Sequence, residues 1–102
     1  MKKTVCCNQE LKNLISAIDL SDFFKLLSDP NRLKVISLLS KQDLCVCKIY
    51  KSLRLSQNLV SHHLSKLKSA GLLKERRDGN FIIYSLDKVV FRKYRSIFIN
   101  LI

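Results

Sequence analysis

The segment from Asp43 to Gly71 constrains the fold more than any other part of this 102-residue chain. Two short stretches in it carry apolar residues at helical spacing, and only Arg54 and Leu55 separate them. Asp43 and Ser56 can each cap a helix N-terminus with a side-chain oxygen. Gly71 can end the second helix in a left-handed conformation. Two helices joined by so short a connection form a helix-turn-helix, here over about residues 43–71.

Two further helices are predicted before this segment. Apolar residues at helical spacing predict one over residues 9–28, after an N-terminal arm of residues 1–8. Ser28, Asp29 and Pro30 then mark a helix end followed by a new start, because Asp29 can cap a helix and proline fits its first position. The new helix is expected to end near Lys41.

After Gly71 the apolar pattern changes period. Asp78, Gly79 and Asn80 lie between two strand-like runs, 72–77 and 81–86, and the Asp-Gly pair predicts a tight hairpin because a primed turn requires positive φ. Asp87 then opens a last helix, over about 87–101. The expected fold is mainly α with a β-hairpin wing (72–86), in the order α-α-α-α-β-β-α, as one domain over residues 9–102.

Charge points to a polyanionic partner. The chain has 19 Lys and Arg against 8 Asp and Glu, for a net charge of +11 and a pI of about 9.8. A small basic domain is typical of nucleic-acid binders, although a basic surface can also serve solubility alone. No apolar run approaches the roughly 18 residues of a membrane span, and the N-terminus lacks the apolar core of a signal peptide. We therefore expect a cytoplasmic protein that does not bind membranes.

The second helix of the helix-turn-helix has two distinct faces. Its expected buried stripe consists of Leu59, Val60, Leu64 and Leu67. The opposite, polar face consists of Gln57, Asn58, Ser61, His62, Ser65 and Lys68. Amide side chains can pair bidentately with adenine in the major groove, and the helix N-terminus at Ser56 can bind a phosphate. His63 lies nearer the stripe and could be a buried structural histidine. The alternative for the polar face is simple solvation.

Basic residues in the hairpin complement that helix. Lys74, Arg76 and Arg77 lead into the predicted turn, where they can contact DNA phosphates without reading sequence. The predicted DNA-contacting set is Ser56, Gln57, Asn58, Ser61, His62, Lys66, Arg76 and Arg77. The alternative for the hairpin residues is a solvated run of charge.

Four cysteines form two close pairs, Cys6 with Cys7 and Cys45 with Cys47. Pairs so close in sequence cannot staple a fold, and a reducing cytosol disfavours disulfides. Thiolate ligands or a redox switch are therefore the better interpretations, against two merely buried core residues. Thiolates select thiophilic ions: As(III) or Sb(III), Cd(II), Pb(II), Cu(I) and less selectively Zn(II). Residues two apart on a helix point about 200° apart, so chelation by Cys45 and Cys47 should require a distorted first turn.

Four motifs together resemble the ArsR/SmtB family of metal-responsive winged-helix repressors. They are LSDPNRLKVISLL, DLCVCKI, LSQNLVSHHLSKLKSAGLL and RRDGNFIIYSL, and the resemblance covers about residues 23–87. It implies a homodimer built from the first and last helices, with each polar helix in a major-groove half-site of a double-stranded DNA operator. Gln57, Ser61 and His62 match the family's DNA-contacting positions. Asn58 also matches one, although the family often has Pro or Ser there.

The family resemblance extends to the cysteines. DLCVC resembles the sensing motif of arsenic-, cadmium- and lead-responsive members, some of which complete the site with N-terminal cysteines of the other subunit. Cys6 and Cys7 are candidates for that role, and an adjacent pair is closer to certain arsenic sensors than to the cadmium/lead sensors. The family's other metal site, for zinc, is expected to be absent because residues 87–102 contain no His and only one acidic residue.

The sequence therefore predicts a dimeric repressor that holds no permanent cofactor and releases DNA when As(III) or Sb(III), or a soft divalent metal, binds its cysteines. Three rivals remain: a cysteine redox sensor, a Cd(II)/Pb(II) sensor of the same family, and a winged-helix adaptor for proteins. An enzyme with a nucleophilic cysteine is not expected, because it would need a phosphate-cradling loop. The only glycines, Gly71 and Gly79, are not near a cysteine. Which cysteines ligate, and whether across subunits, stays open.

Overall fold

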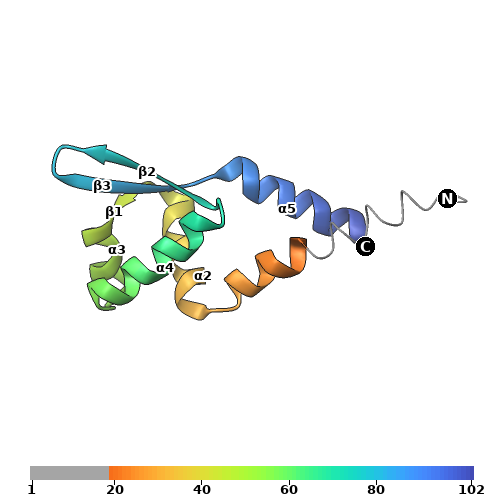
Figure 1. The fold of residues 1–102 in the computed structure, drawn as a ribbon, viewed down its shortest axis with the longest axis horizontal. Helices are drawn as coiled ribbons and strands as arrows, with labels where there is room; N and C mark the ends of the chain where they lie inside the picture. The colour runs from red at the N-terminus through yellow and green to blue at the C-terminus, as the bar shows by residue number, and fades with distance from the viewer. Residues whose placement is uncertain (1–18) are drawn as a thin grey trace, which may run out of the picture.

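The computed structural model describes residues 19–102 (Figure 1). Its first helical segment covers residues 19–27. The elements that follow are α2 (Pro30–Lys41), β1 (Leu44–Cys45), α3 (Val46–Leu53), α4 (Gln57–Ser69), β2 (Leu73–Asp78), β3 (Phe81–Leu86) and α5 (Lys88–Leu101). The predicted winged helix-turn-helix class is confirmed, with one added strand. Cys6, Cys7, the predicted arm and the start of the first predicted helix lie outside the described residues.

The added strand, β1, corrects the predicted start of the third helix. Asp43 does not cap that helix; Cys45 is the N-cap residue instead, with extended backbone (φ −75°, ψ 158°). Leu44 and Cys45 pair antiparallel with Tyr84 and Ile83 of β3, giving the strand order β1-β3-β2. Two residues are too few to show an alternating pattern, so periodicity could not reveal this strand. Its position attaches the first cysteine of the pair to the hairpin.

The other predicted helix starts are confirmed. Asp29 accepts hydrogen bonds from the backbone N–H groups of Asn31 (2.8 Å) and Arg32 (3.2 Å). Ser56 Oγ accepts one from the Leu59 N–H at 3.1 Å, and Asp87 caps α5 in the same way. These side chains satisfy N–H groups that have no partner inside the helix.

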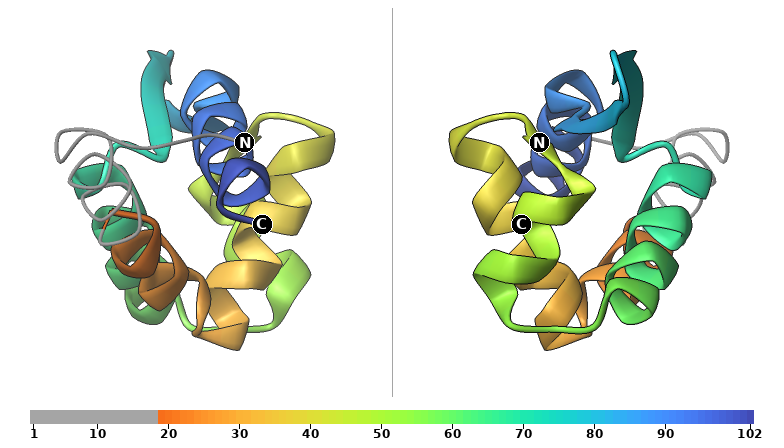
Figure 2. Two further views of the ribbon diagram at one scale, coloured as in Figure 1. Left: turned by 90° about the vertical axis from the view of Figure 1, so that its right-hand side faces the viewer. Right: turned by 90° about the vertical axis from the view of Figure 1, so that its left-hand side faces the viewer.

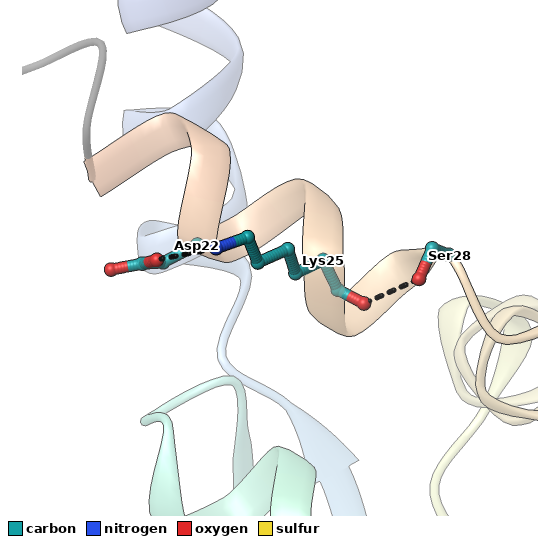
Figure 3. Close-up of polar contacts among 3 residues, drawn as sticks. All are labelled: Asp22, Lys25 and Ser28. Carbon is teal, nitrogen blue, oxygen red and sulfur yellow. Dashed lines mark hydrogen bonds and ion pairs between the residues drawn. The ribbon is translucent and has the colours of Figure 1, made fainter.

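The first helical segment ends at Leu27. Directly after it, the Ser28 hydroxyl donates a hydrogen bond of 2.7 Å to the Lys25 carbonyl (Figure 3), which also accepts one of 3.3 Å from the Ser28 backbone N–H. Lys25 also forms an exposed ion pair with Asp22, at 4.0 Å between Nζ and Oδ1. The local contacts thus end this helix before Pro30 starts the next.

The core lies between α2, α3, α4 and the base of the hairpin, and the first helical segment closes one side of it. Its buried members are Leu20, Phe23, Val35, Leu39, Ile49, Val60, Leu64, Leu67, Leu72 and Leu73. Seen along the long axis, α4 lies on one side of the molecule and α2 with α3 on the other (Figure 2). Phe23 stacks on Tyr94 at 4.2 Å between ring centroids, which joins the first helical segment to α5. Among residues 19–102, no helix has the length and apolar character needed to cross a bilayer.

The hairpin confirms the predicted tight turn. Asp78 pairs with Phe81, which leaves Gly79 and Asn80 as the connection, and Gly79 has φ +62°. A positive φ at the first of two turn residues matches the right-handed twist of the strands and favours glycine. The hairpin extends from the core at the end opposite to α5 (Figure 1).

Candidate DNA-binding face and cysteine site

The polar face of α4 is exposed along its length. Its six predicted members, Gln57, Asn58, Ser61, His62, Ser65 and Lys68, are all solvent-accessible. Within residues 19–102, only Lys68 of this set forms a side-chain hydrogen bond; it donates to Glu75 of β2, and this ion pair lowers the pKa of the Glu75 carboxyl. The amides, hydroxyls and imidazole ahead of Lys68 are thus available to an outside partner.

The buried side of α4 differs from the prediction at two positions. Leu59 is 37% exposed, whereas His63 is only 4% exposed. Val60, His63, Leu64 and Leu67 have the spacing i, i+3, i+4 and i+7, which defines one helix face, and Leu59 lies at its edge. The prediction from the helical wheel therefore made the buried stripe too wide on the side of Leu59.

His63 has no hydrogen-bond partner at either ring nitrogen among the described residues. Burial lowers its pKa; the Asp29 carboxylate opposes this effect, and the Arg32 guanidinium adds to it. The ring is therefore neutral near pH 7 and serves as a packing element. This agrees with the structural alternative for His63, while His62 beside it faces solvent.

The predicted phosphate-contacting residues lie at the surface of two elements. Lys66 is exposed on α4, and Arg76 and Arg77 are exposed on β2. Arg76 Nη2 lies 3.9 Å from Asp43 Oδ2, a weak surface pair that leaves its side chain 60% exposed. Among residues 19–102, no other ion pair or side-chain hydrogen bond engages these three groups, which leaves them available for DNA phosphates.

The two described cysteines lie together at the start of α3. Cys45 is buried and Cys47 half-buried, and their sulfur atoms are 2.7 Å apart. The prediction that convergence requires a distorted helix is therefore wrong. Cys45 precedes the helix in extended conformation, so the 200° rule for helical neighbours does not apply to it.

The two thiols differ in acidity. The Cys47 thiol beside it lowers the pKa of Cys45, and the backbone N–H groups of Lys48 and Cys47 at the α3 N-terminus add to this. The same contact raises the pKa of Cys47. The neighbouring thiol and the helix N-terminus therefore both favour the thiolate form of Cys45.

A cavity of about 360 Å³ joins the cysteines to the polar face of α4. Its lining includes Cys45, Cys47, Gln57, Ser61 and Phe81, from α3, α4 and the hairpin. Groups separated by ten or more residues in sequence thus share one space. Among residues 19–102, no His, Cys, Asp or Glu joins the two thiols to make a cluster of three.

A second cavity, of about 530 Å³, adjoins the same two cysteines and contains no α4 residue in its lining. Lys48 and Lys51 of α3 contribute to it, together with Asp43. Neither lysine was among the predicted site residues. Lys51 could have been found from its spacing, because it lies four residues after Cys47 and residues four apart share a helix surface, whereas Lys48 follows Cys47 directly and its spacing gave no such signal.

Comparison with known proteins identifies the family. The profile described as "Bacterial regulatory protein, arsR family" matches residues 29–75. The transcriptional repressor SmtB homolog of Synechocystis sp. is 40% identical over 89 residues, which is 86% of this chain and 67% of that protein. This chain belongs to the ArsR family. Its members are transcriptional regulators and not enzymes, so the expectation of a non-enzymatic protein is confirmed.

Other ArsR-family relatives bear names that refer to metals. The cadmium resistance regulator CadC of Listeria innocua is 40% identical, over 68% of this chain and 59% of its own length. The arsenical resistance operon repressor of Staphylococcus xylosus is 39% identical, over 68% of this chain and 66% of its own length. The chain thus spans somewhat less than two thirds of these two relatives.

Solved structures show the same fold. An ArsR-like transcriptional regulator from Rhodococcus sp. has a TM-score of 0.75 at 22% identity, over 83% of this chain and 80% of that one. A winged helix-turn-helix DNA-binding domain from Mycobacterium bovis is described as homodimeric. It has a TM-score of 0.66 at 24% identity, over 99% of this chain and 90% of that one. The fold prediction from sequence is confirmed on this comparison also.

Proposed function

We propose that this ArsR-family protein is a transcriptional repressor that binds operator DNA as a homodimer in the cytoplasm and is released when a thiophilic ion binds Cys45 and Cys47. The observation that carries the proposal is the 360 Å³ cavity, whose lining contains both cysteines and two residues of the DNA-reading face, Gln57 and Ser61. A ligand on the sulfur atoms would lie beside the groups that contact DNA.

The DNA contacts divide into two kinds. Gln57, Asn58, Ser61 and His62 face outward from α4 and can form hydrogen bonds with base edges in a major groove. Ser56 at the α4 N-terminus, Lys66, and Arg76 and Arg77 of the hairpin are suited to phosphates. Substitutions of the base-contacting residues should change which operator sequences are preferred. Substitutions of the phosphate-contacting residues should lower the affinity for every DNA sequence and make the affinity depend less on salt concentration.

The effector is expected to be As(III) or Sb(III), with Cd(II), Pb(II) and Zn(II) as alternatives. Among the described residues at the site, the two thiols are the only soft ligands, and the Cys47 thiol, with the backbone N–H groups at the α3 N-terminus, lowers the pKa of Cys45. The names of the CadC and arsenical-repressor relatives support a metal or metalloid signal. Cys6 or Cys7, from the same or the partner subunit, would supply the third sulfur.

The strand β1 offers a route from ligand to DNA. Two sulfurs bound to one ion at a near-tetrahedral angle, with bonds of about 2.3 Å, lie more than about 3 Å apart, which exceeds the 2.7 Å in this structure. A shift of Cys45 to that separation would act on Ile83, its partner in the hairpin strand β3. Ligand and operator would then favour different arrangements of α3 and the hairpin, and each would weaken the other's binding by the same factor.

The dimer proposal rests on the exposed apolar side chains of α5. Within the described residues 19–102, no residue of this helix is fully buried, and Val89, Phe98 and Ile99 are 68%, 42% and 58% exposed. A cavity of about 500 Å³ lies between α5 and the first helical segment, lined by Leu20, Phe24 and Phe98 among others. A second copy that covers this surface would bury apolar area that a monomer leaves in water. Light scattering of the wild type and an Ile99→Lys variant tests this.

The DNA proposal is tested by fluorescence anisotropy with DNA from the chain's own promoter region. Ser61→Ala should reduce affinity, and Ser37→Ala, an exposed serine on α2, is its matched control. The effector proposal is tested by adding arsenite, antimonite, Cd(II), Pb(II) and Zn(II) to the complex under reducing conditions. Arsenite should release the wild type but not the Cys45→Ser/Cys47→Ser variant. Unchanged release of that variant would refute the assignment.

A cysteine redox sensor is the second candidate, favoured by the sulfur separation of 2.7 Å and the lowered pKa of Cys45. Hydrogen peroxide would take two electrons and two protons from the thiols, giving a Cys45–Cys47 disulfide and two waters. Intact mass after peroxide treatment distinguishes the candidates. Loss of two hydrogens together with loss of operator binding supports the redox sensor, whereas release by arsenite without any oxidation supports the metalloid sensor.

A further inference from the structure

The 530 Å³ cavity beside the cysteines has the size of a small-molecule site, for which roughly 300–1,000 Å³ is typical. Besides the cysteines, its lining consists of the apolar residues Leu44, Phe81 and Ile83 and the polar residues Gln42, Asp43, Lys48 and Lys51. Both sulfur-bearing residues contribute to the lining. A molecule in this cavity would therefore contact the thiols and the ammonium groups together.

The charges at this cavity favour an anion. Lys48 and Lys51 are exposed on α3, so their ammonium groups can turn toward a bound molecule at little cost. The cavity's acidic residue, Asp43, has Arg76 at 3.9 Å, which offsets part of its negative charge. A thiolate and the Asp43 carboxylate are negatively charged and cannot pair with a carboxylate. Within this lining, Lys48 and Lys51 are therefore the groups that can bind one.

We propose that this cavity binds a small thiol bearing carboxylate groups, whose sulfur becomes the third ligand of an arsenic atom held by Cys45 and Cys47. The proposal rests on the proposed function, in which As(III) binds Cys45 and Cys47. It adds that a small thiol can supply the third sulfur ligand in place of Cys6 or Cys7. Three thiols replace the three hydroxyls of arsenous acid. Each thiol proton leaves with a hydroxyl as water, so three As–S bonds form and three waters are released, and arsenic remains trivalent. The thiol's carboxylates pair with Lys48 and Lys51.

The experiment uses the full chain carrying Cys6→Ser and Cys7→Ser, so that no N-terminal thiol competes. Arsenite is added with reduced glutathione, with the neutral thiol 2-mercaptoethanol, or with a phosphine reductant alone. Native mass spectrometry should detect a complex of protein, one arsenic and one glutathione. Arsenite should bind about fivefold more tightly with glutathione than with 2-mercaptoethanol, the effect of two exposed ion pairs.

Lys48→Gln/Lys51→Gln in the same background should abolish the preference, so that arsenite binds this variant equally tightly with glutathione and with 2-mercaptoethanol. Lys34→Gln/Lys93→Gln removes the same charge from exposed positions on α2 and α5 and should retain the preference. Equal binding with both thiols, or no ternary mass, would overturn the inference. If arsenite still releases wild-type protein from the operator through Cys45 and Cys47, the proposed function stands without it. If arsenite fails to bind those cysteines under every condition, the proposed function fails first.

Discussion

Replacement of His63 by leucine is expected to stabilise the fold. The imidazole is 4% exposed, and neither nitrogen has a hydrogen-bond partner among the described residues. An unsatisfied buried polar group costs roughly 1–3 kcal/mol, while a change of shape in a packed core costs up to about 1.5 kcal/mol. The free energy of unfolding should rise by about 1 kcal/mol at pH 7, equivalent to about 4–8 °C in Tm for a domain of this size.

The same residue should make stability depend on pH. Burial lowers the pKa of His63 below its ordinary value of 6.5. Below that value the unfolded chain binds a proton that the folded chain resists, so the free energy of unfolding decreases as pH falls from about 6.5 through the lower folded pKa. His63→Leu removes this contribution. Its advantage over the wild type should therefore be larger at pH 5.5 than at pH 7.5.

Urea unfolding followed by circular dichroism at both pH values measures these quantities, at one protein concentration because a dimer's stability depends on concentration. His62→Leu is the matched control: it changes an exposed ring on the same helix and leaves the buried imidazole in place. Two results would refute this reasoning: a His63→Leu protein less stable than the wild type at pH 7.5, or the same loss of stability in both proteins between pH 7.5 and pH 5.5. Either result would show that the His63 imidazole has hydrogen-bond partners in the folded protein.

Three further changes test individual features. Arg54→Gly should raise the free energy of unfolding by about 0.5 kcal/mol in urea, because Arg54 adopts left-handed backbone (φ 56°) and relief of that cost exceeds the added freedom of the unfolded chain. Ser56→Ala should lower it by about 1 kcal/mol, through loss of the cap on the Leu59 N–H; no change would mean that water replaces the hydroxyl. Cys47→Ala should slow alkylation of Cys45 by iodoacetamide at pH 7, measured by peptide mapping, because the Cys47 thiol is the main cause of the lowered Cys45 pKa; an equal rate would assign that effect to the helix N-terminus.

The helix order and the outward face of α4 were predictable because each depends on local chemistry. Capping side chains, Pro30 at a first helical position and the positive φ of Gly71 and Gly79 act within a few residues of themselves. The sequence therefore predicted the hairpin and every helix start after residue 28 except that of α3. The exception has a tertiary cause, since β1 exists only because β3 offers it a partner.

The cysteine site was predicted in its residues but not in its geometry. Helical spacing suggested that Cys45 and Cys47 point apart, whereas the extended backbone of Cys45 brings the sulfurs together. Nor could spacing show that Gln57 and Ser61 share a cavity with them, because this depends on how α3 and α4 pack around the turn at Arg54. Contacts between separate elements are set by the fold as a whole.

Two routes from the cysteines to DNA follow from this packing, and they predict different changes on ligand binding. Through β1 and β3 a shift of Cys45 reaches the hairpin, where Arg76 and Arg77 are placed for phosphates. Loss of those contacts would reduce the slope of log affinity against log salt by about 0.9 for each phosphate released. Through the shared cavity the ligand instead alters Gln57 and Ser61, which would reduce discrimination between operator and altered sequences and leave the slope unchanged. Anisotropy titrations at several salt concentrations, on operator and mismatched DNA with and without arsenite, separate the routes, and a change in neither quantity would exclude both.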